Sequence, residues 1–391
     1  MLYSTSNISV LSIALPKVLL KAKFLIPLIP IGLSIFAKNF HGIKSPELSR
    51  LGEDLLGVLL NSLRQGDFRN VLRRSSGIPQ AIICVLKTEP YGQKGLLFPR
   101  TMTELLDLAE KGFTDEIKIH ALNILKFIFR DSTLKSDIEA YISRGLMIAI
   151  RGFSSNDWMI RNSSLMLFSS IAKRTVGAEK IADEQSSRSN LTILEFFTRA
   201  PELADFFLNE VQKYIDSSTI SFEILSNTSP QVEQENHKES LYPSLYPIAL
   251  LMSRLLPYDT KRGSSNAHTD KGEDEENEGE EAGQPGQTEE LIAKIERFLP
   301  LFVQAAHNKN YMGRLMCAKA VVSLIKHQDI SKHVMELLEL DHLSQRRVLK
   351  TDHNYGHGLL LQIYYLLKNH FDIQENAPIS TEKVSSCWLF F

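Results

Sequence analysis

The run with the most chemical potential in this sequence is Arg73-Arg74-Ser75-Ser76-Gly77-Ile78-Pro79. Two guanidinium groups offer forked N–H donors that match phosphate oxygens, the serine hydroxyls add donors, and Gly77 lets a ligand approach the backbone closely. The run therefore suits contact with a phosphate backbone. The alternative is structural: the arginine pair caps a preceding helix, and a Ser-Gly turn leads into the apolar run at residues 78–86.

Four further candidate residues lie at helix ends. Arg130 and Asp131 close one expected helix, where they form either a local charge-assisted pair or a ligand contact. Trp158 precedes Arg161 by less than one helical turn, and both are candidates for binding a partner or RNA. A tryptophan here anchors neighbouring repeats if it is buried and contributes a binding hot spot if it is exposed.

His353 and His357 are four residues apart, a spacing that would place both imidazoles on one helix face beside a metal ion. A metal site needs further ligands, and Asp352 is the acidic residue that stands close. Gly356 and Gly358 indicate a loop entering a helix rather than a helix interior. We therefore interpret His357 as a capping or packing residue, and keep it as a binding candidate.

Motifs that cradle nucleotides or activate nucleophiles are missing: the sequence has no GxGxxG, GxxxxGK[ST], GxSxG or HExxH. We therefore expect no catalytic residue, no cofactor and no metal, and an accessory protein rather than an enzyme. The three cysteines are widely separated and form no CxxC pair, which argues against a disulfide framework or a zinc ribbon. This cysteine usage favours a reducing compartment, and we expect the cytoplasm.

These candidates must be held by helices, because apolar residues recur at spacings of three and four from residue 47 onward and convincing alternating strands are missing. The expected helices cover residues 47–64, 101–110, 115–129, 137–150, 157–173, 201–214, 242–255, 289–307, 311–326, 331–340 and 356–369.

Some of these helices share a pattern. Lys118, Arg161 and Arg314 align, each is followed by small and aliphatic residues at equivalent positions, and each is preceded by Asp or Asn. The preceding polar residues are Asp115, Asp157 and Asn310. The step of 43 residues from Lys118 to Arg161 fits HEAT and armadillo units. The sequence predicts an all-α solenoid of HEAT/armadillo-like repeats, with a globular helical bundle as the alternative.

Composition divides the chain into five segments. Residues 47–258 and 289–371 form the helical repeat core, and the polar segment 259–288 is expected to be a disordered insertion. The insertion is strongly acidic: residues 270–290 carry a charge of −9, so the rest of a chain whose total is −2 carries +7. A mildly basic body permits contact with phosphates, although an ordinary solvated surface explains the same excess. Residues 372–391 form a diverged tail.

Residues 1–46 contain an apolar stretch that is interrupted by lysines and by Pro27 and Pro30. The remaining apolar piece is shorter than the ~20 residues that a membrane-spanning helix needs. We interpret it as the end of a preceding repeat and do not expect a membrane partner. The rival hypothesis is a HEAT-repeat adaptor for a membrane or signalling partner.

The sequence resembles the thyroid adenoma-associated (THADA) family over residues 48–371. Its heptapeptide at Arg73–Pro79 is similar to the family's signature, which usually has Ala where this chain has Ser76. Further matching motifs follow in the expected order: HALNILKFIFRDSTL at 120–134, GFSSNDWMIRNSSLMLFSSI at 152–171, EFFTRAPEL at 195–203, the helix around 242–257, and HNYGHGLLLQIYYLL at 353–367.

The resemblance implies a HEAT and armadillo-type scaffold that is the non-catalytic partner of a FtsJ-like methyltransferase. In fungal members that complex methylates the ribose 2′-hydroxyl at position 32 of the tRNA anticodon loop, and the catalytic groups and the S-adenosylmethionine site belong to the partner. The expected partners are therefore this methyltransferase and tRNA. Full-length relatives are far longer, so the chain corresponds to their central domain.

Overall fold

The computed structural model describes residues 51–65, 77–87, 97–134, 138–177, 191–227, 244–257, 285–347 and 353–375. These residues form helices and their connections, and their one β interaction is an isolated parallel bridge between Thr192 and Leu256. The prediction of an all-α fold is confirmed. The predicted apolar segment 1–46, most of the insertion and most of the tail lie outside the described residues.

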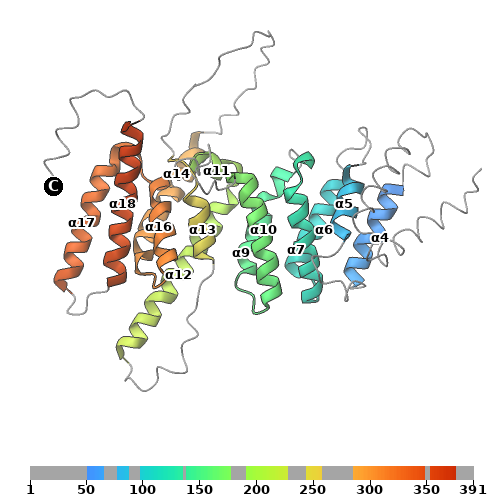
Figure 1. Ribbon diagram of the computed structural model, residues 1–391, viewed down its shortest axis with the longest axis horizontal. Coiled ribbons are helices and arrows are strands. Elements are labelled where there is room, and N and C mark those ends of the chain that lie inside the picture. Colours follow the sequence, from blue (N-terminus) through green and yellow to red (C-terminus); the bar gives the residue numbers. More distant parts are fainter. Residues whose placement is uncertain are drawn as a thin grey trace, which may run out of the picture. The chain divides into compact units, whose positions relative to one another are not determined.

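The chain divides into two compact units, residues 1–175 and 176–391, within the last turn of one helix. In unit 1 (blue to green in Figure 1) the helices are α4 (Leu51–Gln65), α5 (Ile78–Lys87), α6 (Leu97–Lys111), α7 (Asp115–Arg130), η1 (Ser132–Leu134), η2 (Glu139–Tyr141), α9 (Ile142–Gly152) and α10 (Trp158–Val176). Helix α7 packs against α4, α5 and α6, and its buried residues include Ile124 and Phe129.

Glycine allows close packing of α9 in this unit. A Cβ on Gly145 would lie only 2.9 Å from Ile171 Cδ1 of α10 and 3.0 Å from the Phe129 ring of α7. Such contacts are tighter than packed atoms tolerate, so a larger residue would push α9 away from both neighbours.

Unit 2 comprises α11 (Ile193–Arg199), α12 (Glu202–Asn227), α13 (Leu245–Met252), α14 (Pro285–Glu296), α15 (Phe298–Gln304), η4 (Ala305–His307), α16 (Tyr311–Leu324), η5 (His327–Asp329), α17 (Ile330–Arg347) and α18 (His353–Glu375). Its core contains a cluster of fully buried phenylalanines from α11, α12 and α15. Phe197 and Phe298 stack with ring centroids 5.8 Å apart and planes 13° apart, although a hundred residues separate them in sequence. Burial of these rings holds α11, α12 and α15 together.

The aligned polar residues Asp157 and Asn310 make the same local structure in both units. Asp157 Oδ1 accepts a hydrogen bond from the backbone N–H of Met159 at 2.7 Å. Asn310 Oδ1 accepts from the N–H of Met312 at 2.9 Å. Each side chain therefore satisfies an N–H group that the first helical turn leaves unpaired.

The aligned arginines also make the same contacts. Arg161 donates from Nη1 to two backbone carbonyl oxygens in the loop before α10, at 2.7 and 2.9 Å. Arg314 makes the equivalent bonds before α16, also at 2.7 and 2.9 Å. The acceptors are Ser155 and Asn156 for the first arginine, and Asn308 and Lys309 for the second. The predicted equivalence of these two helices is confirmed at the level of hydrogen bonds.

The third aligned helix differs by one position. Thr114, and not Asp115, is the N-cap of α7, and its hydroxyl accepts from the N–H of Ile117 at 3.4 Å. Asp115 is instead the first residue of the helix and pairs with Lys118 at 3.8 Å. Asp115 thus precedes Lys118 as expected, but it lies inside the first turn, where its negative charge also stabilises the helix N-terminus.

Two helix predictions need correction. The expected helix at 289–307 is broken between Glu296 and Phe298, because the ring of Pro300 cannot donate a backbone hydrogen bond and clashes with the preceding turn. Gly356 and Gly358, interpreted as a loop, lie inside the first turns of α18. Gly358 is needed there for packing, since a Cβ would lie 2.8 Å from Ala306 Cβ.

Candidate functional site

The structure describes only the end of the basic heptapeptide. Arg73, Arg74, Ser75 and Ser76 lie outside the described residues. The Gly77 carbonyl accepts from the N–H of Ala81 at 3.0 Å, and Ile78 and Pro79 are buried in the first turn of α5. Buried side chains offer no surface to a partner, so Ile78 and Pro79 act as the anchor that attaches the heptapeptide to the core of unit 1.

Asp131 pairs across the fold, not with its neighbour Arg130. Its carboxylate lies 2.7 Å from the Lys87 ammonium of α5 and accepts a 2.9 Å hydrogen bond from the N–H of Thr133. Burial acts to raise the pKa of Asp131, but the hydrogen bonds from Lys87 and Thr133 outweigh it and hold that pKa below its ordinary value. The local Arg130–Asp131 pair expected from sequence is therefore replaced by a tie between α5 and α7.

Arg174, which no sequence pattern singled out, completes this junction. From α10 it donates through Nη1 to the carbonyl oxygens of Phe129 at 3.0 Å and Asp131 at 2.8 Å. These carbonyls belong to the end of α7, which an α-helix leaves unpaired. Arg130 is exposed and makes no ion pair with another described residue, which leaves its guanidinium accessible to a partner.

Helix α10 presents an exposed face that combines apolar and cationic side chains. Trp158 is 64% exposed and Leu165, seven residues later, is 50% exposed. Arg161 lies between them on the same face and is also exposed. We call Trp158, Arg161 and Leu165 the α10 face. A tryptophan this exposed is not an anchor between packed helices, and the role of Trp158 as a partner contact stays a prediction.

His357 has a defined hydrogen-bonding partner. The Arg314 Nε donates to His357 Nδ1 at 3.2 Å, and Arg314 Nη1 donates to Asn354 Oδ1 at 2.8 Å. This guanidinium therefore joins the loop before α16 to the first turn of α18. A metal ion on His357 Nδ1 would have to displace the arginine, and its charge would be repelled by it. Among the described residues no group of three or more potential metal ligands lies together.

The two equivalent arginines should differ in their contribution to stability. Arg314 is only 9% exposed and holds α18, whereas Arg161 makes its loop contacts in water. We expect Arg314→Met to lower the free energy of unfolding of unit 2 by about 1.5 to 3 kcal/mol, because buried acceptors lose a charged donor. We expect Arg161→Met to cost less than about 0.5 kcal/mol. Urea denaturation followed by circular dichroism measures both, and equal losses would contradict the assignment.

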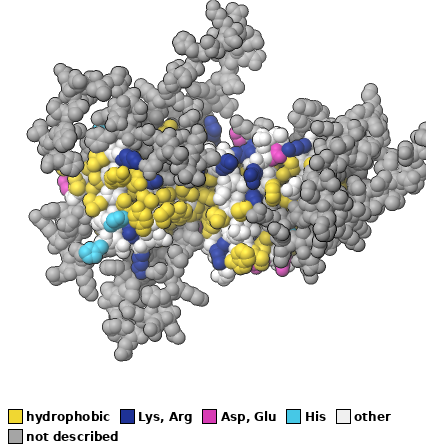
Figure 2. All heavy atoms as spheres, viewed as in Figure 1, with side chains coloured by type: hydrophobic (Ala, Val, Ile, Leu, Met, Phe, Trp, Pro, Cys, Tyr) yellow, Lys and Arg dark blue, Asp and Glu magenta, His cyan; other side chains and the backbone are white. Residues whose placement is uncertain are grey.

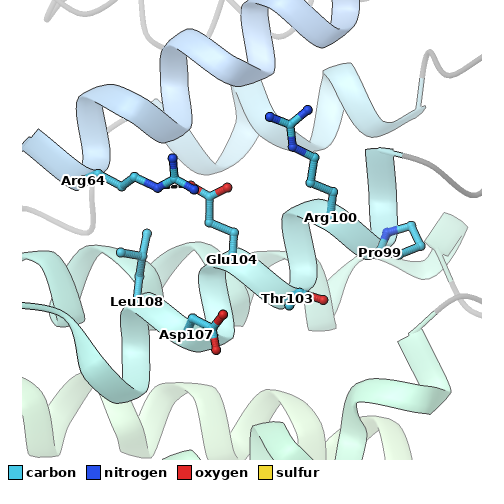
Figure 3. A pocket seen from close by; sticks show the side chains of 7 residues that line it. All are labelled: Arg64, Pro99, Arg100, Thr103, Glu104, Asp107 and Leu108. Atoms are coloured by element: carbon cyan, nitrogen blue, oxygen red, sulfur yellow. Dashed lines mark ion pairs between the residues drawn. The ribbon is translucent and has the colours of Figure 1, made fainter.

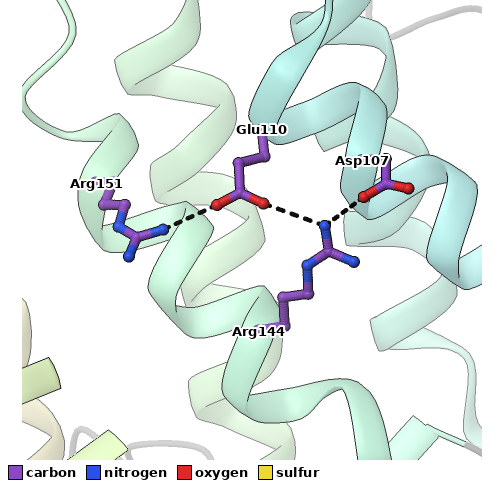
Figure 4. A network of polar contacts seen from close by, with 4 residues as sticks. All are labelled: Asp107, Glu110, Arg144 and Arg151. Carbon is purple, nitrogen blue, oxygen red and sulfur yellow. Dashed lines mark hydrogen bonds and ion pairs between the residues drawn. The ribbon is translucent and has the colours of Figure 1, made fainter. Parts of the chain in front are cut away.

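Ion pairs join α6 to α9 in unit 1 (Figure 4). Arg144 lies between Asp107 and Glu110, with N–O distances of 2.6 and 3.1 Å. Glu110 also accepts from Arg151 at 2.9 Å. Two cations and two carboxylates balance one another, so this surface is electrically neutral and is a weak candidate for binding a polyanion.

A pocket of about 510 Å³ opens between α4 and α6 (Figure 3). Its lining residues are Arg64, Pro99, Arg100, Thr103, Glu104, Asp107 and Leu108. Arg64 points toward Glu104 and pairs with it at 2.8 Å, while Arg100 pairs with Glu53 at 3.2 Å. Burial raises the pKa of Glu104, and the nearby guanidinium groups only partly offset it. The pocket's arginines are engaged within the protein, so it carries no anion-binding assignment.

The helices that the structure describes include none both long and apolar enough to span a bilayer. The apolar stretch behind the membrane-adaptor hypothesis lies outside the described residues.

Family models match most of the chain. Residues 29–159 match a domain described as THADA/TRM732, DUF2428. Residues 161–271 and 281–366 match one described as Trm732, C-terminal TPR repeats. The gap between these last two ranges falls within the predicted acidic insertion. TPR, HEAT and armadillo units are all stacked helical repeats, so the predicted repeat architecture is confirmed.

Curated relatives are similar over most of this chain. The tRNA (32-2′-O)-methyltransferase regulator THADA of Homo sapiens is 31% identical over 335 residues, which cover 83% of this chain and 15% of the relative. The THADA regulator of Gallus gallus is 29% identical over 85% of this chain and 15% of its own length. The tRNA (32-2′-O)-methyltransferase regulator trm732 of Schizosaccharomyces pombe is 30% identical over 60% of this chain. The chain thus spans about 15% of the length of these relatives. No solved structure matches it.

Proposed function

The chain belongs to the THADA/Trm732 family, and we propose that it is part of a non-catalytic regulator of tRNA 2′-O-methylation. In this proposal a FtsJ-like methyltransferase supplies the catalytic groups and S-adenosylmethionine, and the modified ribose is at position 32 of the anticodon loop. The proposed compartment is the cytoplasm.

The observation that carries the proposal is the order and extent of the family matches. Two family domains follow one another along the chain without overlap, and together they cover most of both structural units. Relatives from animals and fission yeast are named as regulators of the same methyltransferase activity.

A binding role is supported by the exposed apolar and cationic side chains on α10. The α10 face exposes Trp158 and Leu165 beside Arg161 on one helix of unit 1. Exposed aromatic and cationic side chains of this kind supply most of the energy in protein interfaces. In contrast, the acids and arginines between α6 and α9 pair internally, which is expected of side chains that hold helices together rather than bind a ligand. We therefore assign the α10 face to the methyltransferase.

Co-expression of the tagged chain with the FtsJ-like methyltransferase of the same organism tests this function. We expect the chain to capture the methyltransferase, to bind no S-adenosylmethionine by itself, and to have no methylation activity alone. Cells in which the protein containing this chain is deleted should lose 2′-O-methylation at position 32 while other tRNA modifications remain. Normal methylation in the deletion, or turnover by the isolated chain, would refute the proposal.

A further inference from the structure

Histidines make contacts near both ends of α18, the last described helix of unit 2. Near its start, Arg314 Nε of α16 donates a hydrogen bond to His357 Nδ1 at 3.2 Å. Near its end, the ring of His370 stacks on that of His327 in η5, with centroids 4.8 Å apart and planes 22° apart. We call His327, His357 and His370 the contact histidines. Figure 2 shows histidine side chains on the surface of unit 2, beside hydrophobic ones.

The contact at His357 requires an imidazole without a proton on Nδ1. A guanidinium can only donate, so Nδ1 must supply the lone pair. Arg314 is buried and held in place by further hydrogen bonds to Asn308, Lys309 and Asn354. Protonation of His357 would therefore replace a hydrogen bond by repulsion between two cations, and the arginine is not free to turn away.

The contact between His327 and His370 also favours neutral rings. The Nδ1 atoms of both imidazoles are shielded from water. Burial lowers the pKa of His370, and the neighbouring His327 lowers it further. Two imidazolium ions stacked at this distance would repel each other. Acid therefore acts against the contacts at both ends of α18.

Two further histidines beside α18 act in opposite directions. His333 of α17 pairs with Glu336 at 3.1 Å, but burial lowers its pKa by more than the carboxylate raises it, so acid also disfavours its folded environment. His307 of η4 stacks on Tyr355 of α18 at 3.9 Å, and a protonated imidazole would be attracted to that ring. Other charged residues on elements around the stacked pair are Lys319, Lys326, Asp329, Lys368, Asp372 and Glu375. They are of both signs, and the net effect on His370 is a lowered pKa.

We propose that the contact histidines make the end of unit 2 pH-sensitive: their protonation releases α18 from α16 and η5. Helix α17 packs on α18 and η5, so it loses its support when α18 moves. Helices α16, α17 and α18 are adjacent in Figure 1. This end of unit 2 is therefore closed at neutral pH and opens in mild acid.

The pH range follows from proton binding in the two states. A histidine that must stay neutral in the closed state binds fewer protons there than in the open state. The stability that it contributes is complete above the ordinary histidine pKa of about 6.5, and is lost as the pH falls below that value. One such histidine raises the ratio of open to closed molecules about tenfold between pH 7.5 and pH 5.5. A second histidine multiplies this effect.

Hydrogen exchange of the complete chain, measured by mass spectrometry, tests this proposal. After correction for the intrinsic pH dependence of amide exchange, peptides from α17 and α18 should exchange about tenfold faster or more at pH 5.5 than at pH 7.5. The test variant combines two substitutions. His357→Gln keeps an oxygen that accepts from Arg314, and His370→Phe keeps a ring that packs on His327. This double variant should lose most of the pH response, because neither new side chain takes up a proton.

The matched control is His353→Gln, which replaces an exposed histidine one helical turn before His357. It should show the pH response of the parent chain. An equal pH response in the double variant and the parent would overturn the proposal, and so would exchange of α18 that slows in acid. If His370→Phe does not fold, His327→Phe removes the same stacked pair from the side of η5 and should give the same result.

Discussion

The Trp158→Ala variant should bind the methyltransferase about 30-fold more weakly, or worse, while folding normally. A tryptophan that becomes enclosed at the centre of an interface contributes about 2 to 4 kcal/mol when truncated to alanine. In the free chain Trp158 is 64% exposed, so the variant loses little packing and its stability should change by about 0.5 kcal/mol or less. Titration calorimetry or surface plasmon resonance with purified methyltransferase measures the affinity.

Two variants control this prediction. Trp158→Phe should recover part of the affinity, because a smaller ring still fills the partner's pocket. Phe113→Ala removes another aromatic side chain of unit 1 that is 98% exposed, but one that lies beside the acidic Asp115 and Glu116 rather than on α10. It should bind like the parent chain. Wild-type affinity of Trp158→Ala would show that the α10 face is not the interface.

Long helices with a single apolar stripe were predictable from the sequence. Helix α7 was expected at residues 115–129 and is found at Asp115–Arg130, because apolar residues recur along it at spacings of three and four. Its burial is wider than that stripe, since residues 119–126 are all buried. Helix α11 was missed, since seven residues give too few turns for periodicity to detect. Its start was nevertheless marked in the sequence by Thr192 and Glu195, which form a capping box. Capping patterns identify short helices that periodicity overlooks.

The candidate site was less predictable, because its decisive contacts join residues far apart in sequence. Asp131 was paired with Arg130 on sequence proximity, whereas the fold brings Lys87 to its carboxylate and Arg174 to its carbonyl. Arg174 is 43 residues from Asp131, and no local spacing rule connects them. The exposure of Trp158 also depends on how helices pack around it, so sequence left both of its interpretations open.

The two aligned arginines also show that sequence predicts local contacts better than contacts with distant helices. Arg161 and Arg314 occupy equivalent positions and bond equivalent carbonyls, which the sequence alignment anticipated. Their environments differ because α18 packs on α16 and gives Arg314 two further acceptors, Asn354 and His357. Equivalent residues in these two helices therefore share their local hydrogen bonds. Whether the side chain is buried depends on the helix that packs against it.

The largest effect is expected from replacing both Arg73 and Arg74 by alanine. If each guanidinium makes one charge-assisted contact to the tRNA backbone or the methyltransferase, the loss is about 3 to 6 kcal/mol, and methylation in a reconstituted complex should fall more than about a hundredfold. The anchor formed by Ile78 and Pro79 remains in the core of unit 1, so helical content should be unchanged. Primer extension at low nucleotide concentration, which detects the ribose methyl group, measures the modification.

The cause of this loss can be separated by binding measurements on the same variant. Loss of phosphate contacts would weaken the salt dependence of tRNA affinity, by about 0.7 to 0.9 in slope per contact. Loss of a contact with the methyltransferase would abolish co-purification and leave RNA binding by the chain intact. Arg73→Lys/Arg74→Lys keeps the positive charge but not the forked N–H donors. It should therefore be more active than the double alanine variant only if the positive charge alone is enough for the contact. Lys111→Ala, which removes an exposed cation at the end of α6, should behave as the parent. If the arginines instead cap the end of a helix, the double alanine variant should melt at a clearly lower temperature, and the heptapeptide would then be a structural motif.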